Sequence, residues 1–114
     1  MPHEWHDSEL LTDPQEFYIA TTETVPFSWD VTQLLELGET PSNPGCRVDR
    51  MVSRNTGIEV EDAATVNPTI LSNVIIVTID GSKLQQDKLY RVLVSFDATP
   101  AKRMTCMTML KCIA

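Results

Sequence analysis

The sequence predicts an all-β fold, a single antiparallel β-sandwich of about seven short strands with an extended N-terminal arm. Two observations support this prediction. Short stretches of alternating apolar and polar residues follow one another, with turn residues between them at spacings of roughly 8 to 15 residues. No apolar pattern of helical period extends beyond a turn or two. The 114 residues are the usual size of one domain. A small β-barrel is the main alternative.

Residues 1–15 are expected to form an arm outside the core. They are polar and acidic and carry two prolines. Segments of this composition often stay loose until a partner orders them. The scattered apolar residues Trp5, Leu10 and Leu11 are therefore candidate partner-binding residues, and for Trp5 alone the favoured alternative is packing back over the domain's own core. The sandwich domain is expected to cover residues 16–114.

The first strands of the domain are predicted between Phe17 and Val31. After a polar stretch, apolar residues share one face, and Phe27 and Trp29 among them are expected in the core. Pro26 on the opposite face indicates an edge strand or a strand start, because proline donates no ladder hydrogen bond. Residues 38–45 contain two glycines and two prolines, which predicts a long turn-rich connection.

The middle of the chain predicts a strand near residues 46–52 with Cys46, Val48 and Val52 on one side, and short strands at 58–60 and 69–71. The strongest candidate strand runs over residues 73–80, since it consists almost entirely of β-branched residues. Its inward side chains are expected to be Ile75, Val77 and Ile79.

Tyr90 opens a strict alternation of apolar residues six positions after Leu84. A tyrosine at the start of a strand can bury its ring while its hydroxyl bonds back to the upstream backbone, as at the corner of an immunoglobulin-like sandwich. The expected core comprises Phe27, Trp29, Val48, Ile75, Val77, Ile79, Leu84, Tyr90, Val92, Val94 and Phe96.

The final strand, expected over residues 103–113, is apolar on both faces. Such a strand is covered on both sides, either as a central strand or by another subunit or the arm. Met107 and Met109 lie on the second face and are therefore further candidate partner-binding residues.

Charge is unevenly distributed. Residues 1–46 hold nine acids and no Lys or Arg, whereas the rest of the chain holds seven acids and nine bases. The formal charge is therefore −9 for residues 1–46 and +2 for the remainder, which gives the net charge of −7. An acidic excess argues against a nucleic-acid partner. One interpretation is that the acidic residues form a solvated face that keeps the protein soluble. The other is that the acidic and basic ends of neighbouring copies, or of a different partner, meet in an assembly.

Membrane insertion and secretion are not expected, because no apolar run approaches roughly 20 residues and the start Met-Pro-His-Glu-Trp-His lacks the features of a signal peptide.

Cys46, Cys106 and Cys112 have no metal-binding or disulfide spacing and are expected to be buried free thiols. His3 and His6 have no second ligand pair for a zinc site. No phosphate-binding, dinucleotide-binding or nucleophile-elbow motif occurs. No catalytic residue, metal or cofactor is therefore expected, and the protein is not expected to be an enzyme.

Several short motifs follow one another in a recognisable order over roughly residues 13 to 112. They are Asp13-Pro14-Gln15-Glu16, Phe27-Ser28-Trp29-Asp30, Leu34-Leu35, Gly38-Glu39-Thr40, Asp80-Gly81-Ser82 and Leu84 through Val94. In this order the chain resembles the immunoglobulin-like adaptor family of tailed-bacteriophage virion proteins, the fiber-tail or head-tail adaptors. The final strand is richer in Met and Cys than such domains usually are.

The resemblance implies a non-enzymatic structural protein of the virion, an adaptor at the neck or tail that joins neighbouring components in a symmetric assembly. The implied partners are other virion proteins of the neck, tail, fiber or capsid and further copies of the chain, after synthesis in the host cytoplasm. One alternative is a capsid decoration or cement protein anchored through Trp5 and the arm. Another is a carbohydrate- or peptide-binding module, for which Tyr18 and Trp5 are the available stacking aromatics.

Overall fold

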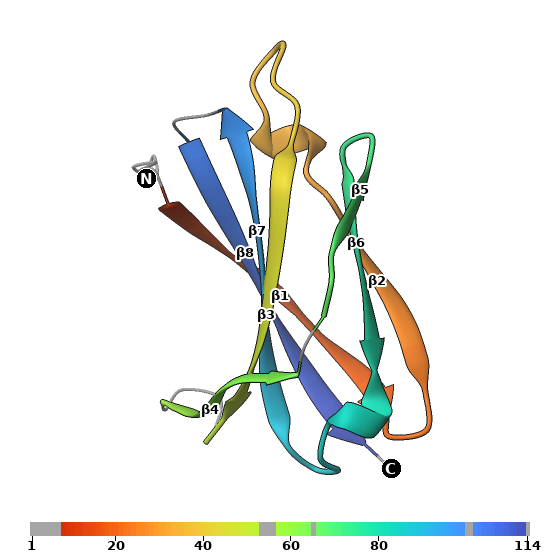
Figure 1. Cartoon of the computed structure of the whole chain (residues 1–114). Helices are drawn as coiled ribbons and strands as arrows, with labels where there is room; N and C mark the ends of the chain where they lie inside the picture. Colours follow the sequence, from red (N-terminus) through yellow and green to blue (C-terminus); the bar gives the residue numbers. More distant parts are fainter. Residues whose placement is uncertain (1–7, 53–56, 65, 100–101, 114) are drawn as a thin grey trace.

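The computed structural model describes residues 8–52, 57–64, 66–99 and 102–113, with the backbone alone described for residues 8–16 and 99. These residues form eight strands and two single-turn 3-10 helices (Figure 1). In chain order they are β1 (Ser8–Ala20), β2 (Thr24–Asp30), η1 (Thr32–Leu34), β3 (Ser42–Met51), β4 (Ile58–Ala64), β5 (Thr69–Leu71), β6 (Val74–Asp80), η2 (Gly81–Lys83), β7 (Leu89–Thr99) and β8 (Lys102–Ile113).

The strands form two sheets that enclose one core, so the prediction of an all-β sandwich is confirmed. The larger sheet has the order β1-β8-β7-β3-β4 and the smaller has the order β2-β6-β5. All neighbouring strands run antiparallel except β1 and β8, which are parallel. Strand β2 is an edge strand, as Pro26 predicted.

Strand β1 corrects the expected extent of the arm. The strand begins at Ser8, and its backbone pairs with β8 from Ser8 opposite Arg103 to Ala20 opposite Ile113. An arm separate from the sheet therefore does not extend to residue 15. The pairing shifts register between Thr12 and Glu16, a stretch that contains Pro14, which has no N–H to donate to a ladder. Trp5 lies outside the described residues.

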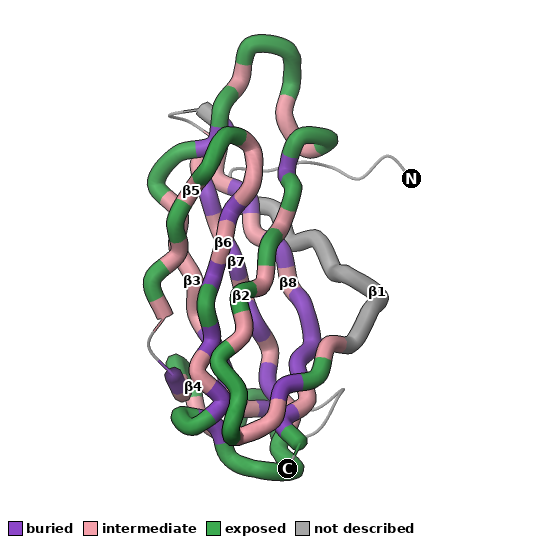
Figure 2. The backbone as a smooth tube through the Cα atoms, turned by 90° about the vertical axis from the view of Figure 1, so that its right-hand side faces the viewer, coloured by how far each residue is buried: buried purple, intermediate pink, exposed green. Residues whose placement is uncertain are grey.

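The core lies between the sheets, where Figure 2 shows the buried parts of the backbone gathered along facing strands. Phe27 and Trp29 are half-buried and pack against it. The other nine residues expected in the core are buried: Val48, Ile75, Val77, Ile79, Leu84, Tyr90, Val92, Val94 and Phe96. The remaining members of the core cluster are Ile19, Val31, Ala64, Ala98, Met104, Cys106, Leu110 and Cys112.

Two local expectations have clear outcomes. The Tyr90 hydroxyl accepts a hydrogen bond from the backbone N–H of Gln85 over 2.7 Å, and the tyrosine is 1% exposed, so the predicted return bond at the strand start is confirmed. The predicted strand near residues 46–52 placed Val52 on the same side as Val48, but β3 ends at Met51, and Val52 lies beyond the strand and is 61% exposed.

Candidate interaction surface

The side of the larger sheet that faces away from the smaller sheet is here called the outer face. Alternate residues of β7 and β8 enter the core, so the residues between them point outward. By the same alternation and the printed register, the outer face comprises Tyr18 of β1, Arg47, Asp49 and Met51 of β3, Leu89, Arg91, Leu93, Ser95 and Asp97 of β7, and Arg103, Thr105, Met107, Met109 and Lys111 of β8.

Asp49 is fully buried on this face, although it belongs to the sheet's outer side. Its Oδ2 atom lies 2.8 Å from Nη2 of Arg91 and 3.1 Å from Nη2 of Arg47. Its Oδ1 atom accepts the backbone N–H of Asp62 at 2.9 Å and lies 2.9 Å from Nε of Arg47. One carboxylate thus joins three strands, β3, β4 and β7.

The local backbone of β4 explains how this carboxylate is reached. The register between β3 and β4 shifts between Val48 and Arg50, which flank Asp49, and again between Arg50 and Met51. Asp62 has a positive φ of 54°. This bulge turns the Asp62 N–H toward the sheet. Burial alone raises the pKa of Asp49, but the Asp62 amide, Arg91 and Arg47 together outweigh it, so the pKa is lowered and the group is charged at neutral pH.

A second polar cluster surrounds Arg103. Its Nη1 donates to Oδ1 of Asp97 at 2.9 Å and to the carbonyl of Asn43 at 3.1 Å, and its Nη2 donates to Oγ of Ser95 at 2.9 Å. The Asn43 amide also donates to Asp97, and these two partners lower the pKa of Asp97. A β-carbon on Gly45 would lie 3.0 Å from Nη2 of Arg103, so the glycine leaves room for the guanidinium.

Between the two clusters the outer face is hollowed. The hollow has a volume of about 340 Å³ and is lined by Cys46, Arg47, Leu93, Ser95 and Thr105. It combines a cation, two hydroxyls and a leucine side chain. Burial, and then the charge of Asp62, raises the pKa of the Cys46 thiol to about 12, so this cysteine is not a nucleophile at neutral pH.

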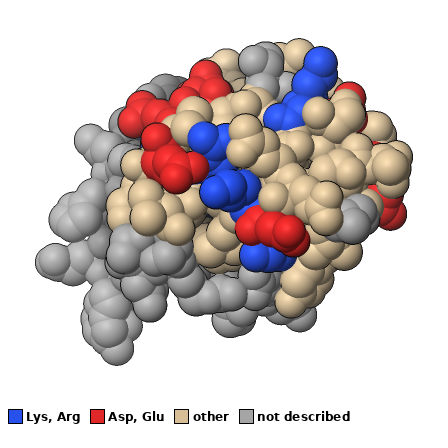
Figure 3. Space-filling model, turned by 90° about the horizontal axis from the view of Figure 1, so that it is seen from below, with Lys and Arg blue, Asp and Glu red and all other residues tan. Residues whose placement is uncertain are grey.

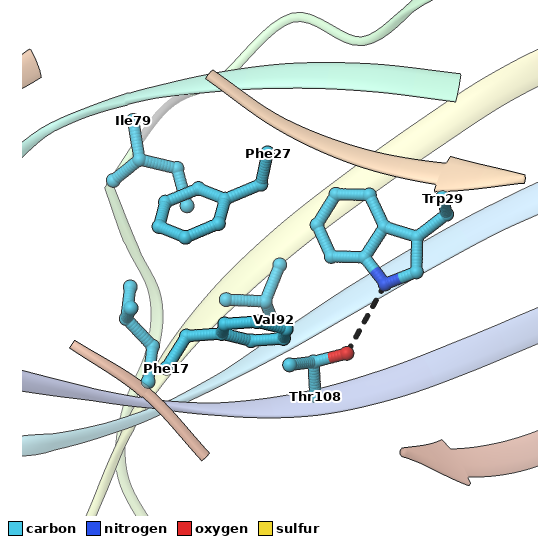
Figure 4. Close-up of a pocket in the computed structure, with 7 residues that line it drawn as sticks. Phe17, Phe27, Trp29, Ile79, Val92 and Thr108 are labelled. Atoms are coloured by element: carbon cyan, nitrogen blue, oxygen red, sulfur yellow. Dashed lines mark hydrogen bonds between the residues drawn. The ribbon is translucent and has the colours of Figure 1, made fainter. Parts of the chain in front are cut away.

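The void described between the two sheets is much smaller than this hollow. Figure 4 shows Phe27 and Trp29 directed toward Phe17, Val92 and Thr108 across a void of about 10 Å³. The indole N–H of Trp29 donates to Oγ1 of Thr108 at 3.1 Å, and the rings of Phe17 and Phe27 have centroids 5.8 Å apart. A void of this size holds at most about one water molecule. These aromatic side chains therefore serve packing.

The candidate partner-binding residues have different positions. Met107 is half-buried on the outer face, next to Leu93 in the register, whereas Met109 is 8% exposed and offers little surface. The backbones of Leu10 and Leu11 pair with β8, and their side chains lie outside the described part. Arg47 and Arg103 were not among the predicted partner-binding residues, although each side chain is 41% exposed at the hollow or beside it. The alternation of Arg47 with Asp49 was the available signal.

Figure 3 shows basic and acidic side chains side by side on the end of the molecule seen from below. Within the described ranges, no group of three His, Cys, Asp or Glu side chains is placed to hold a metal ion. Nor does this part of the chain contain a helix long and apolar enough to cross a membrane.

No protein-family model matches the sequence, and the search of curated proteins found no match.

Proposed function

We propose that the protein is a non-enzymatic structural component of a tailed-phage virion, an adaptor at the neck or tail that joins neighbouring components in a symmetric assembly. The observation that carries the proposal is the composition of the outer face. Half-exposed arginines flank a hollow with an apolar side chain, and Tyr18 is 59% exposed on the same face. Arginine, tyrosine and methionine are the residues enriched in protein interfaces.

The arrangement of strands supports the immunoglobulin-like part of the proposal. In the larger sheet β8, β7, β3 and β4 are consecutive, and in the smaller sheet β2, β6 and β5 are consecutive. This is the order in which variable-type immunoglobulin domains place their G, F, C and C′ strands and their B, E and D strands. The hydrogen bond from Gln85 to the Tyr90 hydroxyl, at the start of β7, occupies the place of the tyrosine corner.

The distribution of charge supports assembly rather than solubility alone. The first 46 residues contain no Lys or Arg, whereas the arginines of the outer face all follow residue 46 in the sequence. An uneven distribution of charge along the chain favours contacts between copies, because the acidic part of one copy attracts the basic part of the next.

The proposal is tested on the purified full-length chain. Sedimentation velocity over a range of concentrations, with electron microscopy of the same samples, should reveal closed symmetric oligomers. Pull-down experiments against the portal, neck, tail and capsid proteins of the phage that encodes the chain should recover at least one of them. A protein that stays monomeric at high concentration and recovers none of these proteins would contradict the proposal.

A further inference from the structure

The loop between η1 and β3 projects beyond the sheets at the top of Figure 1. Leu37 is fully exposed, at 106% of its reference area. The Glu39 N–H donates to the carbonyl of Glu36 at 3.0 Å, and the Glu36 N–H donates to Oε1 of Glu39 at 2.7 Å. Gly38 supplies the positive φ of 87° that this turn requires. The tip, defined as residues 36–39, is therefore an ordered turn.

An ordered turn is a suitable element for docking. Its two internal hydrogen bonds already fix the backbone, so little conformational entropy remains to be lost on binding. Burying a leucine that is fully exposed is favourable, because it removes a large apolar surface from water. Glu36 and Glu39 stand on either side of Leu37 in the sequence, so the tip combines an apolar centre with an acidic border.

The hollow of the outer face has the complementary chemistry. Leu93 contributes apolar surface, Arg47 lines one side, and Arg103 is hydrogen-bonded to the Ser95 that also lines it. Both arginine side chains remain 41% exposed after making their pairs within the chain. The volume of about 340 Å³ is several times the ~30 Å³ share of one water molecule and admits a branched aliphatic side chain.

We propose that Leu37 of one copy docks into the hollow of a second copy, with the acidic border of the tip against Arg47 and Arg103. The inference rests on the proposed function and names the partner as the chain itself. The tip and the hollow are different surfaces, so the contact is head-to-tail. Each bound copy keeps one free tip or one free hollow, and repetition of the contact forms a ring if the rotation closes.

The first test removes the apolar centre of the tip. The Leu37→Ser variant should weaken self-association roughly tenfold or more in sedimentation velocity, as expected for a central interface anchor. Leu71→Ser is the matched control, because Leu71 is 69% exposed on β5 and lies outside both surfaces. Its association should equal that of the wild type. Circular dichroism confirms that both variants remain folded.

The second test changes the charge of the hollow at Thr105, which leaves the Asp49 and Asp97 ion pairs in place. Thr105→Glu places a carboxylate opposite the acidic border and should weaken association roughly tenfold or more, whereas Thr105→Lys should preserve it. The two substitutions remove the same side chain and differ in charge. Equal association of the two variants would overturn the inference.

The third test asks whether the two surfaces meet. A tagged Leu37→Cys chain is mixed with an untagged Thr105→Cys chain under mild oxidation, and the mixed disulfide is measured by mass. Every chain in this test also carries Cys46→Ala, because the native Cys46 lines the hollow. The control mixture uses Thr78→Cys, an exposed threonine on a strand of the smaller sheet. A mixed disulfide more abundant with Thr105→Cys than with Thr78→Cys supports the contact, and equal abundance overturns it.

The outcomes separate this inference from the proposed function. If the wild type assembles and the Leu37→Ser and Thr105→Glu variants assemble equally well, the contact between tip and hollow is refuted and the adaptor proposal stands. If the wild type stays monomeric, the contact is refuted as well, and recovery of a virion protein in the pull-down then decides whether the adaptor proposal survives.

Discussion

Gly81 lies against the backbone of Ala20 so closely that a β-carbon on the glycine would overlap the Ala20 carbonyl oxygen. The Gly81 N–H also donates to the carbonyl of Glu23 at 2.7 Å. Ala20 ends β1 in the larger sheet, and Glu23 precedes β2 in the smaller one. This glycine therefore fastens η2 to the turn that links the two sheets.

Replacing this glycine should be costly. Gly81→Ala is expected to lower the free energy of unfolding by about 1–3 kcal/mol or more, because the clash is with backbone rather than with a flexible side chain. Gly57→Ala is the matched control, since a β-carbon there has no atom within 4 Å. Urea denaturation followed by circular dichroism measures both variants. Equal stabilities for the two would contradict the predicted role of Gly81.

The Tyr90 hydroxyl provides a second test of the scaffold. Tyr90→Phe keeps the buried ring but leaves the Gln85 N–H without its acceptor, which should cost about 1–2 kcal/mol of stability. Tyr90→Ala also removes the ring and should cost about 3–5 kcal/mol. Tyr18→Phe changes an exposed hydroxyl and should be nearly neutral. Chemical denaturation should place the variants in this order, and a neutral Tyr90→Phe would exclude a stabilising hydrogen bond.

Asp49 is expected to be essential for the attachment of β4. Asp49→Asn removes the negative charge between two arginines and should destabilise the fold by about 3–5 kcal/mol. Asp97→Asn, on the same face but partly exposed, should have a smaller effect. Thermal unfolding of the two variants measures the difference. Hydrogen exchange should show the greatest loss of protection in β4 of Asp49→Asn, and unchanged exchange there would contradict the assignment.

The same carboxylate makes stability dependent on acid. The pKa of Asp49 is lower in the folded chain than in the unfolded chain, where it is about 3.9. Its contribution is fully present above the unfolded pKa and is lost as pH falls through the lower, folded pKa. The free energy of unfolding should therefore decrease below about pH 4. In Asp49→Asn this decrease should be shallower, and urea denaturation at several pH values measures it. If the free energy of unfolding falls with pH as steeply in Asp49→Asn as in the wild type, the prediction is wrong.

The cysteines should be protected in the folded protein. None of the three forms a disulfide; Cys106 and Cys112 are buried, and burial raises the pKa of Cys46 and of Cys112. A thiol reagent such as dithionitrobenzoate should react slowly at pH 8, because the reactive species is the thiolate. In urea all three thiols should react rapidly. A fast reaction of one thiol without urea would show that the environment of Cys46 is more open than its burial implies.

The strands of the core were predictable because one buried face imposes a period of two on the sequence. Val92, Val94 and Phe96 follow this rule and are buried. The parallel pairing of β1 with β8 was not predictable in the same way. The prolines and acids in residues 1–15 indicate a loose segment. The strand edge with which this segment pairs belongs to β8, about a hundred positions later in the sequence, so no local pattern reveals the pairing.

The outer face was harder to predict for a related reason. Asp49 and Arg91 are separated by 42 positions, and Trp29 and Thr108 by 79, so their hydrogen bonds depend on the fold rather than on any local pattern. The apolar residues on both faces of the final strand correctly predicted that this strand is covered on both sides. They did not reveal that Met109, flanked by β1 and β7, is already buried within the single chain.

The parallel pair of β1 and β8 also has a mechanical consequence. The chain enters β1 at Ser8 beside the start of β8 and leaves β8 at Ile113 beside the end of β1 (Figure 1). Tension applied between these two ends slides the strands along each other, so their hydrogen bonds are loaded together in shear and do not peel open one after another. A domain with this geometry resists stretching best along the line that joins its two attachment points.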